Sequence, residues 1–192
     1  MRLALTLLAA VALAAVIVVG LTQAGGQSEP AAKPAGFDLQ ATQQRLTAAP
    51  GELGAFYEDA NELLPEAEFE SRLKALKGIP LVINKWASWC GPCRSEFPIF
   101  QQTAAARGTD VAFVGVNAAD ARPAAEEFLA ERPLPYPSFE DPDEAIAQDL
   151  KVSTYFPMTL FVDEKGRTAY IKAGEYRTAA DLEADIDRYL GA

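Results

Sequence analysis

The chain has 192 residues, of which 49% are hydrophobic and 23% charged, which fits one ordinary globular domain with some additional sequence. Its net charge of −10 disfavours nucleic-acid binding, because the phosphates would be repelled. The sequence contains no histidine, which excludes imidazole general-base catalysis, a Cys–His nucleophile pair and histidine-containing zinc or copper sites.

The additional sequence lies at the N-terminus. Arg2 precedes an apolar run over residues 3–21, which is interrupted only by Thr6 and Gly20. As a helix this run would reach roughly 28 Å, close to the thickness of a hydrocarbon core and more than most signal-peptide cores. The run predicts a signal anchor or transmembrane helix over residues 1–21, with a cleaved signal peptide as the alternative. Because Arg2 lies on its N-terminal side, the rest of the chain is expected outside the cytoplasm.

Two segments connect this run to the main domain. Residues 22–36 are small and polar and include Gly and Pro, which is typical of a flexible linker. Residues 37–64 contain short apolar groups separated by Pro50 and Gly54, and form an N-terminal extension for which we expect partial helix packed on the main domain. The main domain is predicted to span residues 65–192.

Hydrophobic periodicity in the main domain predicts alternating strands and helices. Helices are predicted over residues 65–78, 97–107, 123–131 and 143–150, and from Thr178 to Leu190. Strands are predicted over residues 79–86, 110–116, 158–162 and 167–172. Strands that alternate with helices require a parallel sheet covered on both faces, and the final hairpin adds antiparallel strands. The predicted fold class is therefore α/β with a mixed central sheet.

The chemistry-bearing motif is Trp89-Cys90-Gly91-Pro92-Cys93, placed where a predicted buried strand meets a helix. Two intervening residues bring the sulfurs within bonding distance when the segment forms the first helical turn. Unpaired N–H groups and the dipole at a helix N-terminus favour the thiolate form. We therefore expect Cys90 to be the attacking thiol and Cys93 the resolving thiol.

Three other interpretations of the cysteine pair remain. A zinc site would need carboxylates for its other ligands. An inert structural disulfide is compatible with an exported domain, although so short a loop would stabilise the fold little. A Cu(I) carrier could use the two thiolates alone. Redox exchange is favoured, because the strand-to-helix context is the one that a redox Cys-x-x-Cys motif requires, and no metal or cofactor is expected.

Residues 81–98 (Leu-Val-Ile-Asn-Lys-Trp-Ala-Ser-Trp-Cys-Gly-Pro-Cys-Arg-Ser-Glu-Phe-Pro) resemble the core signature of the thioredoxin superfamily. Within it, they are similar to the TlpA/ResA-like group of extracytoplasmic thiol–disulfide oxidoreductases. The resemblance covers about residues 65–190 and includes the segments 114–117, 141–143 and 156–163. It implies a thioredoxin-like fold, with a central mixed sheet, helices on both faces, a helical insertion over residues 121–150, and a C-terminal hairpin and helix.

The resemblance also implies residues that bind substrate. Pro157 is similar to the group's cis-proline, which packs opposite the cysteines, and Phe156 would offer its backbone to an extended substrate strand. The alternative is an ordinary trans proline at the start of a strand. Substrate contacts are also expected from Trp89, Gly91 and Pro92, although Trp89 is better explained as packing around the site than as a ligand.

Glu96 corresponds to the acid of the group's Cys-x-x-Glu pattern. A partly buried carboxylate one helical turn after Cys93 could shuttle the proton that the resolving thiol loses and regains. The alternative is a solvated helix residue. Asn84 stands where cytoplasmic thioredoxin has a buried Asp, and because an amide cannot titrate, any proton-transfer role moves toward Glu96.

The sequence therefore predicts a thiol–disulfide oxidoreductase, with the reductase direction favoured. Gly-Pro without His between the cysteines predicts a potential nearer to about −270 mV than to the about −120 mV of a strong oxidant. Expected partners are disulfide-bearing exported proteins and a membrane thiol electron donor, and the resemblance implies apocytochrome c thiols and cytochrome c maturation. We expect the protein in the cell membrane through its N-terminal helix, or secreted if that segment is cleaved. A thiol peroxidase of related fold remains the other enzymatic alternative.

Overall fold

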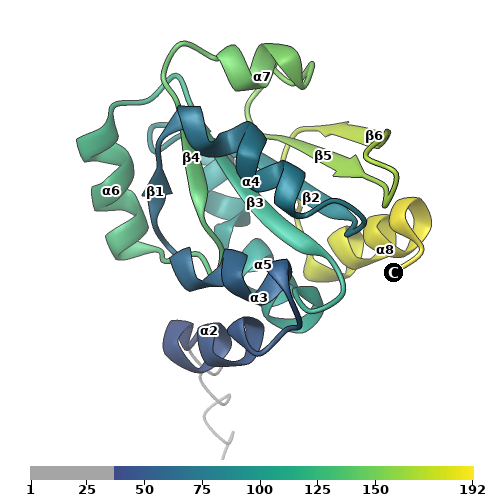
Figure 1. The fold of residues 1–192 in the computed structure, drawn as a ribbon. Helices are drawn as coiled ribbons and strands as arrows, with labels where there is room; N and C mark the ends of the chain where they lie inside the picture. The colour runs from purple at the N-terminus through teal and green to yellow at the C-terminus, as the bar shows by residue number, and fades with distance from the viewer. Residues whose placement is uncertain (1–36) are drawn as a thin grey trace, which may run out of the picture. The chain divides into compact units, whose positions relative to one another are not determined.

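A six-stranded mixed sheet organises residues 37–192, which are the residues that the computed structural model describes. The anchor expected over residues 1–21 and the linker over residues 22–36 lie outside them. The strand order is β1-β4-β3-β2-β5-β6 (Figure 1). The first four strands in this order are parallel, β5 runs antiparallel to β2, and β6 runs antiparallel to β5. Within the described part of the chain, no helix is both long and apolar enough to cross a membrane.

The elements follow one another in the order expected of an α/β protein. The strands are β1 (Leu63–Leu64), β2 (Leu81–Trp86), β3 (Ala112–Ala118), β4 (Ser138–Asp141), β5 (Met158–Val162) and β6 (Thr168–Ala173). The helices are α2 (Leu39–Thr47), α3 (Glu52–Phe56), α4 (Phe69–Ala75), α5 (Gly91–Arg107), α6 (Arg122–Glu131), α7 (Ala145–Asp149) and α8 (Ala179–Leu190), with short 3-10 helices at Tyr57–Asp59 and Glu66–Glu68.

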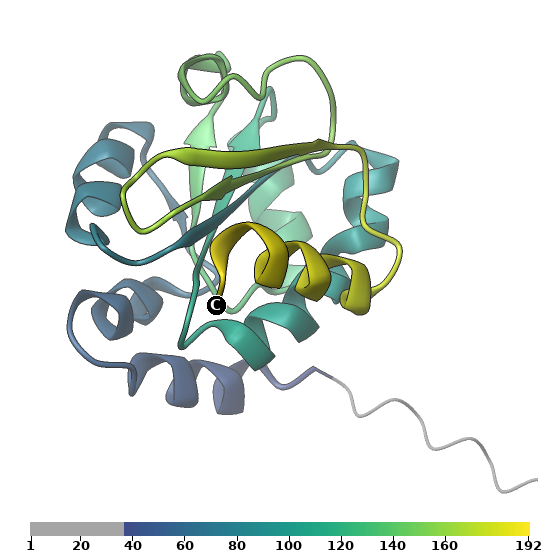
Figure 2. The same ribbon diagram turned by 90° about the vertical axis from the view of Figure 1, so that its right-hand side faces the viewer.

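The centre of the sheet is formed by β2 and β3, whose residues are all buried. A strand covered on both faces needs a nearly continuous apolar run, which both segments provide. Helix α4 lies on one face of the sheet, and α5 and α8 pack together on the other (Figures 1 and 2). The predicted α/β class, the mixed sheet, the helices on both faces, and the C-terminal hairpin and helix are confirmed.

Two strands were not predicted from the sequence. Strand β4 lies between β1 and β3, so the segment over residues 121–150 contains the two predicted helices, now α6 and α7, and also a strand that the expected helical insertion did not include. Prolines at positions 133, 135 and 137 lower the strand propensity just before β4. Its pairing partners are distant in sequence, and Ser138 N donates to Glu62 O at 2.9 Å.

Residues 37–64 belong to the same compact unit as the rest of the described chain. Leu46, Leu53 and Phe56 join the main hydrophobic core. Tyr57 is fully buried, and its hydroxyl donates to Val111 O and accepts from Phe113 N, both at 3.2 Å. Satisfying both hydrogen-bonding functions of the hydroxyl allows the large ring to be buried without an unpaired polar atom.

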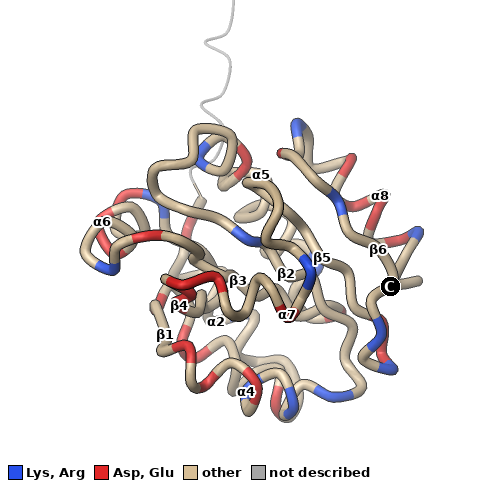
Figure 3. The backbone as a smooth tube through the Cα atoms, turned by 90° about the horizontal axis from the view of Figure 1, so that it is seen from above, with Lys and Arg blue, Asp and Glu red and all other residues tan. Residues whose placement is uncertain are grey.

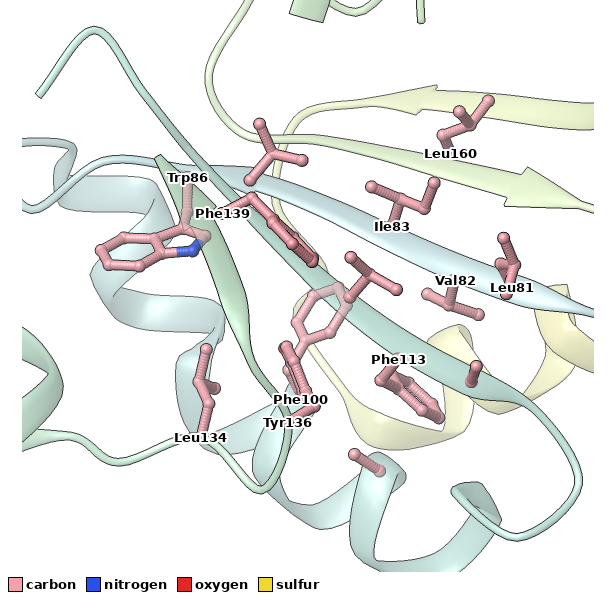
Figure 4. Close-up of a cluster of buried hydrophobic side chains, with 14 of the residues drawn as sticks. Leu81, Val82, Ile83, Trp86, Phe100, Phe113, Leu134, Tyr136, Phe139 and Leu160 are labelled. Carbon is pink, nitrogen blue, oxygen red and sulfur yellow. The ribbon is translucent and has the colours of Figure 1, made fainter. Parts of the chain in front are cut away.

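An aromatic cluster supports the end of β2, just before the cysteine motif. Trp86 contacts Phe97 of α5 and Phe128 of α6, with ring centroids 5.1 and 5.7 Å apart. The Nε1 atom of Trp86 donates to Ser138 Oγ at 3.1 Å. Figure 4 shows the Trp86 side chain among the other buried side chains of the core. Gly115 allows this contact, because a Cβ there would lie 2.0 Å from Ser138 Oγ. The turn that follows β2 thus starts from a rigid base.

Candidate redox site

Cys90 is the N-cap of α5, and Cys93 lies in the first turn of that helix. Helix α5 begins at Gly91, so the motif forms its first turn as expected, and the helix continues through the predicted helical run over residues 97–107. The cysteines form a disulfide with a Cα–Cα distance of 5.3 Å, and Cys90 Sγ accepts a hydrogen bond from Cys93 N at 3.1 Å. Cys90 is 3% exposed and Cys93 is fully buried. A sulfur that accepts a backbone N–H at a helix N-terminus is in the environment that stabilises a thiolate after reduction.

The turn before the cysteines is held by Asp120, a residue that the sequence did not single out. Its carboxylate accepts from Ser88 N at 2.5 Å and from Ser88 Oγ at 2.9 Å, and Asn117 Nδ2 donates to it at 2.9 Å. Asp120 follows β3, which is parallel to β2. The carboxyl ends of parallel strands meet at one edge of a sheet, and this could have indicated Asp120 from the sequence.

An aromatic side chain directly precedes the first cysteine. Trp89 is 59% exposed, and Gly91 and Pro92 between the cysteines are also on the surface. Trp89 Nε1 donates to the backbone oxygen of Ala119 at 2.9 Å. A large apolar ring that is fixed by one hydrogen bond and remains mostly exposed suits contact with another molecule.

The peptide bond between Phe156 and Pro157 is cis. The alternative of an ordinary trans proline is therefore wrong, and the geometry is the one that the resemblance implies. The rings of Phe156 and Trp89 lie 4.9 Å apart, which places the cis-proline segment beside the turn that leads into the cysteines. Pro157 O accepts from Gly174 N at 2.9 Å, so this segment is also tied to the chain after β6.

Glu96 is fully buried, so the alternative of a solvated helix residue is wrong. Its two carboxylate oxygens accept from Asn84 Nδ2 at 2.8 Å and from Tyr176 N at 3.0 Å. Burial raises the pKa of Glu96 to about 7, although both hydrogen bonds and the nearby Lys172 ammonium act to lower it. The carboxyl group therefore titrates near neutral pH and lies one helical turn from Cys93.

Asn84 can serve both protonation states of Glu96. Its Nδ2 donates to the carboxylate, whereas its Oδ1 is buried without a hydrogen-bond partner among the described residues. Rotation of the amide would present Oδ1 as an acceptor to a protonated Glu96. Thr159 lies opposite Asn84 in the antiparallel register of β2 and β5, and its buried hydroxyl likewise has no partner.

A disulfide at the start of the helix after the central strand, beside a cis-proline, defines a thiol–disulfide oxidoreductase of thioredoxin-like fold. The Redoxin family matches residues 59–187, and the chain belongs to this family.

Curated relatives and solved structures agree with this class. The chain is 31% identical over 121 residues to the thioredoxin-like protein YneN of Bacillus subtilis, covering 62% of this chain and 69% of YneN. Identity is 28% over 103 residues with thiol-disulfide oxidoreductase ResA of Bacillus subtilis, covering 53% of this chain and 57% of ResA. Identity is 35% with thiol:disulfide interchange protein DsbE of Escherichia coli, covering 52% of each chain. The chain thus spans only about half the length of ResA and DsbE.

Among solved structures, a DsbF homologue from Corynebacterium diphtheriae is similar, with a TM-score of 0.56 and 33% identity over 60% of this chain and 75% of that chain. StoA from Bacillus subtilis is also similar, with a TM-score of 0.51 and 28% identity over 56% of this chain and 82% of StoA. The expected resemblance to ResA-like thiol–disulfide oxidoreductases is confirmed.

Proposed function

We propose that this protein is a disulfide reductase that acts on exported proteins outside the cytoplasm. The observation that carries the proposal is the position of Cys90, whose sulfur caps α5 and accepts the Cys93 N–H at 3.1 Å. The same helix terminus would lower the pKa of the reduced thiol and supply a nucleophile near neutral pH.

In the proposed reaction, the Cys90 thiolate attacks one sulfur of a substrate disulfide and forms a mixed disulfide, and the other substrate sulfur leaves as a thiolate. Cys93 then loses its proton and attacks Cys90 Sγ, which forms the Cys90–Cys93 disulfide and releases the second substrate thiolate. The substrate gains two electrons, which the dithiol loses, and two protons complete its thiols. A membrane thiol donor would return the two electrons to Cys90 and Cys93.

Glu96 is proposed to accept the proton from Cys93 in the second step and to return it on reduction. A group whose pKa is about 7 is present in both forms near neutral pH, so it can take up and release a proton with little free-energy cost. Its position one helical turn from Cys93 and its contact with Asn84 support this role.

The substrate is proposed to lie across Trp89, Gly91 and Pro92, with its backbone extended beside Phe156 and Pro157. The exposure of Trp89 and its contact with Phe156 support this placement. Helices α6 and α8 carry mostly acidic residues (Figure 3), whereas the residues proposed to contact the substrate are uncharged, so apolar and backbone contacts would hold it.

The reductase direction and the cellular context are parts of the same proposal. The Gly-Pro pair between the cysteines supports a potential nearer to that of thioredoxin than to that of a strong oxidant. A disulfide of apocytochrome c, which the reaction would convert into its two thiols, is the candidate substrate, and cytochrome c maturation is the candidate process. The apolar run over residues 3–21 would anchor the protein in the cell membrane, or direct its secretion if it is cleaved.

Trapping tests the proposal. We expect Cys93→Ala to accumulate mixed disulfides with exported proteins through Cys90, because the resolving step is lost, and turnover to fall to background. Cys90→Ala is the matched control and should trap nothing. Non-reducing electrophoresis and identification of the released proteins provide the readout. If Cys90→Ala trapped the same proteins and Cys93→Ala did not, the two roles would be reversed.

The remaining alternatives predict other chemistry for the reduced dithiol. A thiol peroxidase would lose its thiols rapidly on addition of peroxide, and a Cu(I) carrier would retain copper against a strong chelator while failing to reduce insulin. We expect the thiols of the reduced protein to be lost slowly on addition of peroxide, and the reduced protein to reduce insulin rapidly.

A further inference from the structure

Lys85 is a buried cation in the centre of the sheet. It lies in β2 between Asn84 and Trp86, and it is 1% exposed. The other members of this strand are apolar except Asn84, and the carboxylate that pairs with the ammonium group is itself only 28% exposed. A buried ammonium group is costly unless it is paired, so its partners indicate why it is retained.

The first partner is Glu144, which precedes α7. Lys85 Nζ donates to Glu144 Oε1 at 2.7 Å. The backbone of Glu144 has a φ of +58°, in the left-handed region that a glutamate rarely adopts. Glu144 occupies the N-cap position of α7, but its side chain makes no capping hydrogen bond, and Asp141 instead accepts from the N–H groups of Ile146 and Ala147 at 2.9 and 2.8 Å. Its side chain is therefore available to Lys85.

The second partner is the ring of Phe156, the residue before the cis-proline. Lys85 Nζ lies 3.7 Å from the ring centroid, a distance at which a desolvated cation interacts strongly with an aromatic face. The same ring contacts Trp89, which precedes Cys90. Phe156 is thus held between a buried cation and the turn that leads into the disulfide.

Stability alone does not explain a charge at position 85. A buried ion pair can often be replaced by apolar side chains of similar volume with no loss of stability. What such a replacement would remove here is the directional contact between the ammonium group and the Phe156 ring. The contact orients a residue whose backbone lies in the proposed substrate-binding segment.

We propose that Lys85, held by Glu144, is a positioning residue that fixes Phe156 so that its backbone can pair with an extended polypeptide substrate. The inference rests on the proposed function, and it assigns to Lys85 the selection of polypeptide disulfides over small disulfides. Lys85 itself does not touch the reacting sulfurs. A small disulfide needs no strand pairing at Phe156, so its reaction with Cys90 should not depend on Lys85.

The test compares two disulfides as oxidants of the pre-reduced full-length chain: insulin, and the small aromatic disulfide 5,5′-dithiobis(2-nitrobenzoate). In the double variant Lys85→Met/Glu144→Gln no unpaired charge stays buried. We expect its second-order rate constant with insulin to fall about tenfold and that with the small disulfide to stay within about twofold. Equal changes with both oxidants, or no change with either, would overturn the inference.

A second pair of variants tests the same contact from the other side. Phe156→Leu removes the ring and should lower the insulin rate selectively, whereas Phe156→Tyr keeps the ring and should retain the wild-type ratio of the two rates. Equal ratios in these two variants would contradict the inference even if the Lys85 variant did not fold. If the wild-type dithiol were oxidised by neither compound, the proposed function itself would fail, and this inference with it.

Discussion

Two polar clusters lie on opposite faces of the same strand, β2; the first is buried, and the second reaches the surface at Glu144. Asn84 belongs to the first, with Glu96 and the backbone N–H of Tyr176, and Lys85 belongs to the second, with Glu144. Adjacent residues of a strand point to opposite faces, so one strand supplies both clusters. The hydrogen-bond donors to Glu96 are neutral, and burial raises its pKa to about 7, whereas Lys85 and Glu144 neutralise each other's charge.

The difference shows how one strand can support two kinds of function. A carboxyl group with neutral donors can gain and lose a proton at neutral pH, which suits proton exchange with a resolving thiol. An ion pair of opposite charges instead fixes the geometry of the groups around it, here the Phe156 ring. The first cluster is therefore expected to respond to pH, and the second to hold a fixed position.

The largest expected effect is the pH dependence of stability that Glu96 causes. Between about pH 4.5 and 7 the folded protein binds a proton at Glu96 that the unfolded chain has lost. The free energy of unfolding therefore decreases as the pH rises through this window, by about 3 kcal/mol from this group, and is constant above it. Denaturant unfolding of the wild type and of Glu96→Gln measures this effect. The free energy of unfolding of the wild type minus that of Glu96→Gln should decrease as the pH rises. A difference that does not vary with pH would contradict the raised pKa.

A smaller effect is expected when the ion pair is broken. Glu144→Gln keeps the shape of the side chain and leaves the Lys85 charge buried with a neutral acceptor, so we expect the free energy of unfolding to fall by about 2 kcal/mol. The double variant Lys85→Met/Glu144→Gln should recover most of this loss, because no unpaired charge is then buried. Equilibrium unfolding in urea is the measurement. A double variant less stable than Glu144→Gln would show that Lys85 stabilises the fold by another route.

The smallest effect tests whether the two clusters are independent. The charged groups that act on Glu96 are Lys172 and Glu175, so in Lys85→Met/Glu144→Gln the pKa of Glu96 should move by less than about half a unit. Lys172→Met is the positive control and should raise this pKa, because it removes an ammonium group that favours the carboxylate. NMR titration of the carboxyl carbon follows both. A large shift in the double variant would mean that the clusters are coupled.

Much of the fold could be predicted because its signals are local. Apolar runs predicted the central strands β2 and β3, and the predicted strand over residues 158–162 coincides with β5. Thr178 caps α8 through the N–H of Asp181, as its spacing from that residue indicates. Strands β1 and β4 could not be predicted, because they are short and depend on pairing with distant strands.

The residues of the candidate site also fall into two groups, those identified from local sequence features and those whose role depends on partners distant in the sequence. The motif from Trp89 to Cys93 and the proline at position 157 were identified from the sequence, because their spacing and neighbours are local features. The burial of Glu96 was left open, since one of its donors, the Tyr176 N–H, lies 80 residues away. Lys85 was not singled out, because its partner Glu144 lies 59 residues away.

The sequence by itself determined the class of chemistry: two cysteines at helical spacing after a buried strand, in a chain without histidine, leave thiol–disulfide exchange as the favoured reaction. Only the tertiary structure decided which polar side chains lose their contact with water and which groups they then face. The physical reason is that the pKa of a carboxyl group and the cost of a buried charge depend on desolvation, and desolvation is set by segments far apart in the chain.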